Sequence, residues 1–226
     1  MKNNLKTTGQ ALKPFLQHHA NRAKRGEITN AIRNCHVHGL HSIMLHDEGP
    51  GNRIRMFYAD SDNELWRNEY SSSKLSLAVH QHHCDVTLQI IEGTVFNTIY
   101  QFMPENWKYG FPGNERVVKP HITLDEYIYE SAILGAAGSL SPTGRSFGFW
   151  RQGRNLASGP ESMNANTLHT VGMYRDQQAA WLVYEGKEGP DYQSICYTNN
   201  PVFDPSNMYI SDPSVAKEAF QWLKIL

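Results

Sequence analysis

The sequence contains little cysteine. Its three cysteines, Cys35, Cys84 and Cys196, lie far apart, and no CxxC pair indicates a redox motif or a zinc knuckle. Disulfides persist mainly in oxidising compartments. This cysteine usage therefore favours a reducing, cytoplasmic setting.

Long hydrophobic runs are also missing. The N-terminal segment has no apolar stretch of the roughly seven or more residues that a signal peptide needs. No later segment approaches the roughly eighteen apolar residues of a membrane span. We therefore expect neither secretion by this route nor a membrane partner.

Charge of one sign is not in excess. Lys and Arg total 21 against 22 Asp and Glu, which gives a formal net charge of −1 at pH 7. Without a sustained positive field, the sequence predicts no nucleic-acid partner. A Gly-rich phosphate loop, a GxSxG elbow and convincingly spaced carboxylate pairs are absent too, so kinase, hydrolase and dehydrogenase functions have no support.

Short β-type runs fill the chain from residue 42 to about residue 198. They are rich in β-branched and aromatic residues, as in SIMLH, RIRMFYA, VTLQIIEG and AAWLVYEG, and Gly, Pro, Asn, Asp and Ser separate them. Because no helix-length amphipathic run interrupts the series, the pattern predicts an all-β fold, an antiparallel sandwich or barrel such as a jelly roll. Residues 135–166 are the least regular part and predict a long loop over the barrel mouth.

The two ends of the chain predict helices. We expect residues 1–37 to form a helical extension and residues 38–226 to form the barrel with a C-terminal helix. The extension would hold one helix that stops at Gly26 and a second within residues 27–36, where apolar residues follow helical spacing. Asp212 as N-cap and Pro213 at the first helical position begin the C-terminal helix.

The most informative segment is LAVHQHHCDVTLQIIEGTVFN, residues 77–97. His80 and His82 are two residues apart near a strand end, so both imidazoles leave the same face and can share one ion. A polar break at residues 83–85 separates the two histidines from an apolar run that ends before Gly93. This pattern predicts a hairpin with the two histidines at its edge. The side chain of His83 should point away.

This segment resembles the first motif of the cupin superfamily, H-x-H followed by Glu and Gly. Val86 stands where the cupin glutamate would be. The later run NTLHTVGMYRDQQAAWLVYEG looks like the second motif, in which His169 supplies one more histidine. The resemblance implies a cupin-type jelly-roll barrel with a three-histidine site at His80, His82 and His169. A neutral site of this kind suits Fe(II) better than closed structural zinc, and it leaves Zn, Mn and Ni open.

Cupins that lack the glutamate include thiol dioxygenases of the cysteine dioxygenase type, which the run from Glu64 to Tyr100 resembles. In that family an upstream arginine binds the substrate carboxylate, a role that Arg55 or Arg67 would fill here. Tyr58 and Tyr127, on predicted barrel strands, are further candidate pocket donors. The resemblance implies a non-haem Fe(II) dioxygenase acting on a small polar molecule that is thiol-like or amino-acid-like.

Several alternatives stay open at this point. The missing glutamate fits a metal-free ligand-binding or sensor cupin whose cationic N-terminal segment docks a partner. A homodimer is a further possibility, since exposed strand edges pair readily. His121 is a candidate fourth ligand or acid-base group. A rival metal site would use the cysteine and histidines around the end of the second predicted helix and the strand after it, namely Cys35, His36, His38, His41 and His46.

Overall fold

A computed structural model of the chain describes most of its residues. They are residues 9–35, 37–49, 51–65, 79–104, 108–109, 112–113, 116–117, 119–120, 122–130, 139–156, 159–188, 194–198 and 210–226. Their secondary structure is mostly β, as the sequence predicts. In chain order the elements are α1 (Gly9–Lys24), β1 (Ala31–Arg33), β2 (Leu40–Asp47), β3 (Arg53–Ala59), β4 (Val79–His80), β5 (Cys84–Glu92), β6 (Phe96–Met103), β7 (Lys108–Tyr109), β8 (Arg116–Val117), β9 (Ile122–Glu130), β10 (Ser139–Leu156), β11 (Glu161–Met163), β12 (Leu168–Gly172), β13 (Ala179–Glu188), β14 (Ile195–Thr198), β15 (Ile210–Ser211) and α2 (Ser214–Trp222).

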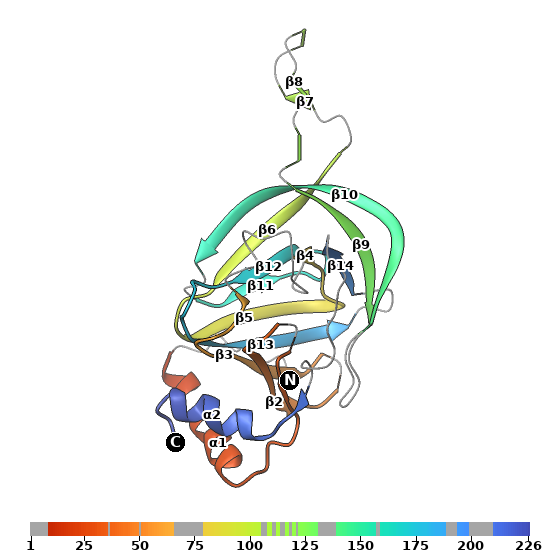
Figure 1. Cartoon of the computed structure of the whole chain (residues 1–226). Coiled ribbons are helices and arrows are strands. Elements are labelled where there is room, and N and C mark those ends of the chain that lie inside the picture. The colour runs from red at the N-terminus through yellow and green to blue at the C-terminus, as the bar shows by residue number, and fades with distance from the viewer. Residues whose placement is uncertain are drawn as a thin grey trace.

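The strands form two main sheets that lie in successive layers (Figure 1). One is a seven-stranded sheet in the order β11-β5-β13-β3-β2-β1-β15, and α1 and α2 cover its outer face. The other is a closed antiparallel barrel in the order β10-β6-β12-β4-β14-β9. The strands β6, β12, β4 and β14 face the seven-stranded sheet, while β9 and β10 arch over their far side. This confirms the predicted all-β, jelly-roll-like fold with helices at its ends.

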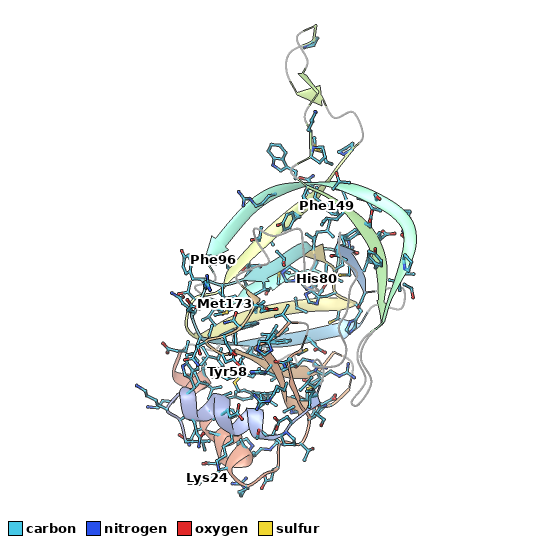
Figure 2. All side chains as sticks on the ribbon, in the orientation of Figure 1. Lys24, Tyr58, His80, Phe96, Phe149 and Met173 are labelled. Atoms are coloured by element: carbon cyan, nitrogen blue, oxygen red, sulfur yellow. The ribbon has the colours of Figure 1, made fainter. Side chains whose placement is uncertain are left out.

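Three apolar clusters fill the spaces between these layers. The first lies between the two sheets and includes Val86, Leu88 and Trp181. The second joins the helices to the seven-stranded sheet, and the third, around Phe149 and Tyr197, lies under the arch of β9 and β10. Figure 2 shows His80 at the level between the two sheets and Phe149 under the arch. His80 and His82 are half-buried there, whereas His169 is buried.

Strand β10 corrects the prediction of a long loop within residues 135–166. It runs from Ser139 to Leu156 and pairs first with β9 and then with β6. The turn-type residues Pro142 and Gly144 lie at an irregularity in the β9 pairing, where Gly144 has a φ of 76°. A bulge accommodates residues that an uninterrupted strand excludes, which explains why their composition predicts a loop.

The predicted second helix is also wrong. Ala31–Arg33 forms strand β1, which pairs with β2 on one side and β15 on the other. Ile28, Ala31, Ile32 and Cys35 are all buried, so their helical spacing marks burial rather than a helix. Backbone pairing on both sides stabilises this short extended segment more than an isolated helical turn would, because short helices are marginal without tertiary support.

The C-terminal helix is close to its prediction. Ser214–Trp222 is helical, the backbone N–H of Ser214 donates to Asp212 Oδ1 at 3.0 Å, and Pro213 is the N-cap. Its buried face packs with α1 against the seven-stranded sheet. Within the part of the chain that the structure describes, no helix combines the length and the hydropathy needed to cross a membrane.

Candidate metal centre

His80 and His82 lie where the chain passes from one sheet to the other. His80 ends β4 in the closed barrel, and Cys84 begins β5 in the seven-stranded sheet. The expected hairpin is therefore wrong, because β4 and β5 belong to different sheets. The backbone N–H of His82 donates instead to Ala165 O at 3.2 Å, which anchors this crossover to the segment after β11.

Three imidazoles meet at this crossover. His169, at the start of β12, is the direct register partner of His80, although it is 87 residues from His82. One ring nitrogen from each of His80, His82 and His169 lies within 4.8 Å of the other two. The Nε2 atoms of His82 and His169 are 2.8 Å apart. Among the described residues this is the one group whose geometry suits a metal ion, and it includes no carboxylate or thiolate.

The side chain of Asn97 holds the ring of His169. His169 Nδ1 lies 2.8 Å from Asn97 Oδ1, and both residues are almost completely buried. Burial, together with the nearby imidazoles of His80 and His82, keeps the pKa of His169 well below its usual value. His169 therefore stays neutral, which is the form that ligates a metal.

The three-histidine group suits a divalent ion by both chemistry and spacing. Imidazole nitrogens bind transition metals at about 2.0–2.1 Å. Two such nitrogens lie about 3.0 Å apart at adjacent octahedral positions and about 3.4 Å apart in a tetrahedron. The 2.8 Å separation between His82 and His169 is close enough for both nitrogens to bind one ion. His80, His82 and His169 are thus the residues that would hold the ion.

Tyr127 and Cys196 share a transverse row with two of these histidines. Tyr127 is the register partner of Cys196, and Cys196 is the register partner of His80. Directly opposed residues of antiparallel strands project from the same face, so all three side chains face the histidine side. Burial, followed by the nearby Asp125 and Cys196, raises the pKa of Tyr127. The sequence indicated Tyr127 but missed Cys196, whose place depends entirely on strand register.

Arg55 lies on the opposite sheet and outside the three-histidine group. Its Nε is 2.6 Å from Glu185 Oε1. Arg55 and Phe57 are two residues apart on β3, so their side chains project from the same face of the sheet. Because Phe57 packs into the cluster between the two sheets, the side chain of Arg55 also points toward that space. Tyr58 leaves the other face, toward the helices, and its ring lies 5.5 Å from that of Trp222. Tyr58 is therefore wrongly predicted as a donor to the barrel interior, and Arg67 lies outside the described residues.

Val86 occupies the expected glutamate position as a buried core residue. It lies on β5 in the cluster between the sheets and is 3 % exposed. Its register partners are Met163 on β11 and Glu185 on β13. The carboxylate of Glu185 pairs with Arg55, so it does not replace the missing ligand.

The remaining histidines of interest do not join the centre. His83 Nδ1 lies 3.5 Å from Ser194 Oγ, in agreement with a side chain that points away from the other two. In the rival cluster, His41 pairs with Asp60 at 2.9 Å and His38 pairs with Asp62 at 3.3 Å. No metal-binding group forms from the described members of that cluster. His36 and His121 lie outside the described residues.

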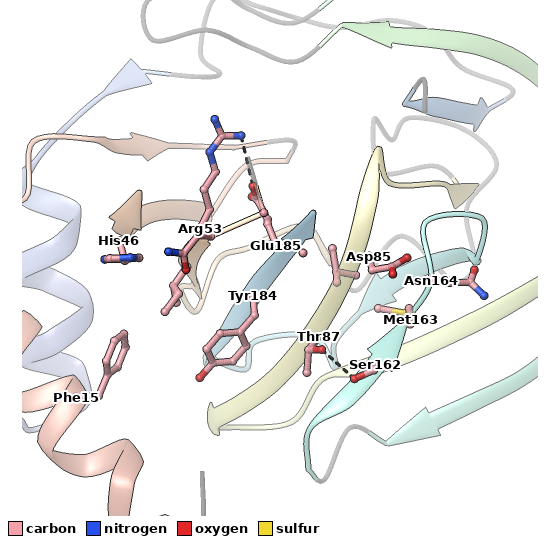
Figure 3. A pocket seen from close by; sticks show the side chains of 15 residues that line it. Phe15, His46, Arg53, Asp85, Thr87, Ser162, Met163, Asn164, Tyr184 and Glu185 are labelled. Carbon is pink, nitrogen blue, oxygen red and sulfur yellow. Dashed lines mark hydrogen bonds and ion pairs between the residues drawn. The ribbon is translucent and has the colours of Figure 1, made fainter. Parts of the chain in front are cut away.

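A groove of about 700 Å³ opens between α1 and the segment around β11 (Figure 3), and its described lining includes none of the three histidines. Arg53 and Glu185 face it from β3 and β13, and the hydroxyls of Thr87 and Ser162 meet at 2.9 Å on another side. Val86 and Met163 contribute to its lining as well. These two residues also belong to the apolar cluster between the sheets, so the groove reaches the edge of that cluster.

Comparisons with known proteins do not assign the chain to a family. No protein-family model matches the chain, and no curated protein matches it. Solved structures with detectable likeness include hydroxypropylphosphonic acid epoxidase from S. wedmorenis, at 12% identity and a TM-score of 0.32 over 68% of this chain and 53% of that one. L-ribose isomerase from Cellulomonas parahominis matches at 9% identity and a TM-score of 0.29, over 93% of this chain and 95% of the isomerase.

The chain thus spans about half the length of the epoxidase. Likeness at this level adds nothing to the strand topology, on which the fold assignment rests. That topology is an all-β, jelly-roll-like architecture in which three imidazoles gather between the sheets.

Proposed function

We propose that this protein is a metal-binding cupin that acts as a non-haem Fe(II)-dependent dioxygenase on a small polar molecule that is thiol-like or amino-acid-like. The observation that carries the proposal is the meeting of His80, His82 and His169 in a group without a carboxylate. Three neutral imidazoles leave the full charge of a divalent ion uncompensated. Such an ion favours anionic or polarisable ligands at its open positions.

A bound Fe(II) would supply the electron-transfer chemistry toward dioxygen, and the protein would supply orientation. Tyr127, in the row of His80, would hold or donate a proton at its phenol oxygen. Its raised pKa keeps that proton in place at neutral pH. Arg55 would offer its guanidinium to a substrate carboxylate once its pairing with Glu185 is exchanged or shared.

Metal content and oxygen uptake test this proposal together. Untagged protein purified without chelators should carry about one iron per chain, and uptake should appear with a subset of thiols or amino acids. His82→Ala should lose both the metal and the uptake. The matched variant His83→Ala, one position away and outside the group, should keep both. Full metal content in His82→Ala would refute the three-histidine site.

A second candidate is a metal-free ligand-binding or sensor cupin. It is favoured by the apolar Val86 at the glutamate position and by the groove next to it. If the protein has this second function, the wild type should stay metal-free after reconstitution. A specific small ligand should then raise its melting temperature without added metal. Stoichiometric iron with turnover would exclude it.

A further inference from the structure

Asn97 lies outside the three-histidine group and is hydrogen-bonded directly to one of its members, His169. It lies on β6 with a fully buried side chain, and its Oδ1 is 2.8 Å from His169 Nδ1. An amide oxygen only accepts hydrogen bonds, so Nδ1 of His169 must carry the ring proton. The lone pair of His169 is therefore on Nε2, the atom that lies 2.8 Å from His82 Nε2.

Met163 fixes which way the amide of Asn97 points. Asn97 Nδ2 lies 3.2 Å from Met163 Sδ, and a thioether sulfur accepts but cannot donate. If the amide were reversed, its oxygen would face the sulfur without a donor, and its NH₂ would face Nδ1 of the imidazole. The reversed amide would lose its hydrogen bond to the sulfur, and its NH₂ could pair with His169 only if the ring proton moved from Nδ1 to Nε2, the atom that faces His82.

We propose that Asn97 is the positioning residue of the metal centre: with Met163 as its anchor, it holds His169 in the single tautomer and ring orientation that present Nε2 to the ion. This inference rests on the proposed metal binding. It assigns a role to a residue that the H-x-H spacing does not indicate, because Asn97 precedes His169 by 72 positions and meets it only through the pairing of β6 with β12.

The choice of an amide rather than a carboxylate has a chemical consequence. A neutral acceptor orients the imidazole without drawing the Nδ1 proton toward a negative charge. Partners of this kind typically change metal affinity by roughly 10- to 100-fold when removed. A carboxylate at the same position would keep the tautomer and make the imidazole more basic.

Two measurements test the role of Asn97. Nitrogen NMR of the metal-free protein should show His169 protonated at Nδ1 in the wild type and in Asn97→Asp, with this preference lost in Asn97→Leu. Competition with a chromophoric chelator for Co(II) should show binding roughly 10- to 100-fold weaker in Asn97→Leu. Asn97→Asp should restore affinity to the wild-type level or above.

Asn63→Leu is the matched control. Asn63 is equally buried and hydrogen-bonded, but it lies in the loop after β3 and contacts Gln177 O. This variant should lower stability and leave Co(II) affinity unchanged. Met163→Leu, which keeps a side chain of similar volume, removes only the anchor and should weaken binding by a few-fold even if Asn97→Leu fails to fold.

The inference is overturned if His169 carries its proton on Nε2 in the wild type. It is also overturned if Asn97→Leu keeps wild-type affinity, or if Asn97→Asp binds as poorly as Asn97→Leu. A wild-type protein that binds no Co(II) would refute the proposed function instead. The tautomer measurement would then decide alone whether Asn97 orients His169.

Discussion

Gly93 and Ala179 lie in direct contact where β5 ends and its neighbour β13 begins. A Cβ atom on Gly93 would come within 2.8 Å of Ala179 Cα and would also overlap Gln178 O. Gly93 follows β5, and Ala179 begins β13 on the same sheet. The glycine that resembles a motif position in the sequence thus has a physical reason: backbone approaches it too closely for any side chain.

Gly93→Ala should therefore be strongly destabilising. Its φ of 87° is unfavourable for any residue with a Cβ, and the overlap with Ala179 adds to that cost. We expect a loss of at least about 2 kcal/mol in the free energy of unfolding, measured by urea denaturation. Gly49→Ala has a similar φ of 93° with nothing within 4 Å, so it should cost only about 1 kcal/mol. Equal losses at both positions would mean that backbone contact at Gly93 has no role.

Metal removal should lower the stability of the folded protein. A ligand that binds only the native state stabilises it by about 2.7 kcal/mol when present at a hundred times its dissociation constant. Chelation should therefore lower the melting temperature of the metal-loaded wild type. In His169→Ala, which lacks one of the three imidazoles, chelator should produce no shift. A chelator effect of wild-type size in that variant would place the metal elsewhere.

The buried ring of His19 should lower the free energy of unfolding in mild acid. It is buried on α1, accepts a hydrogen bond from Arg22 at 3.2 Å, and has its pKa lowered to about 4, mainly by burial and then by Arg22. The His19 ring takes up a proton near pH 6.5 in the unfolded chain but only near pH 4 in the folded protein. The free energy of unfolding is therefore at its full value above about pH 6.5 and decreases as the pH falls toward about 4. His19→Gln should therefore flatten the dependence of unfolding free energy on pH in this window, by on the order of 2 kcal/mol.

The exposed neighbour His18 supplies the control for this effect. The charge of His18 is one of the smaller causes of the lowered pKa of His19, after burial and Arg22, so His18→Gln should reduce the slope between about pH 4 and pH 6.5 less than His19→Gln does. If both variants lower the slope equally, the acid sensitivity comes from the general charge of α1 rather than from the buried ring of His19.

Tyr127→Phe should separate turnover from metal binding. The substitution removes one hydroxyl from the row that contains His80, and it leaves the three imidazoles in place. If the phenol transfers a proton during the reaction, kcat should fall by roughly 100-fold or more with unchanged metal content. Tyr58→Phe removes the same hydroxyl on the far side of the seven-stranded sheet and should leave kcat unchanged. A wild-type kcat in Tyr127→Phe would remove this residue from the proposed mechanism.

Local pattern explains what could be predicted from the sequence. Strand alternation, turn residues and the absence of long amphipathic runs depend on near neighbours, and they were sufficient for the all-β fold and for the C-terminal helix. The H-x-H spacing likewise places His80 and His82 on one side of the chain. The predictions from sequence were wrong where the local pattern is ambiguous. The buried residues at helical spacing around β1 form a strand and not a helix. Pro142 and Gly144, which predict a loop, lie at a bulge within β10.

The amino-acid sequence by itself determined which residue types are available to the centre, and that no carboxylate stands at Val86. Tertiary structure alone decided their meeting, because His169 comes beside His80 only through the pairing of β12 with β4. It also decided the row with Tyr127 and Cys196 and the hydrogen bond from His169 to Asn97. The physical reason is that strand register is set by burying one face of each strand across the whole sheet, a condition that no local segment contains.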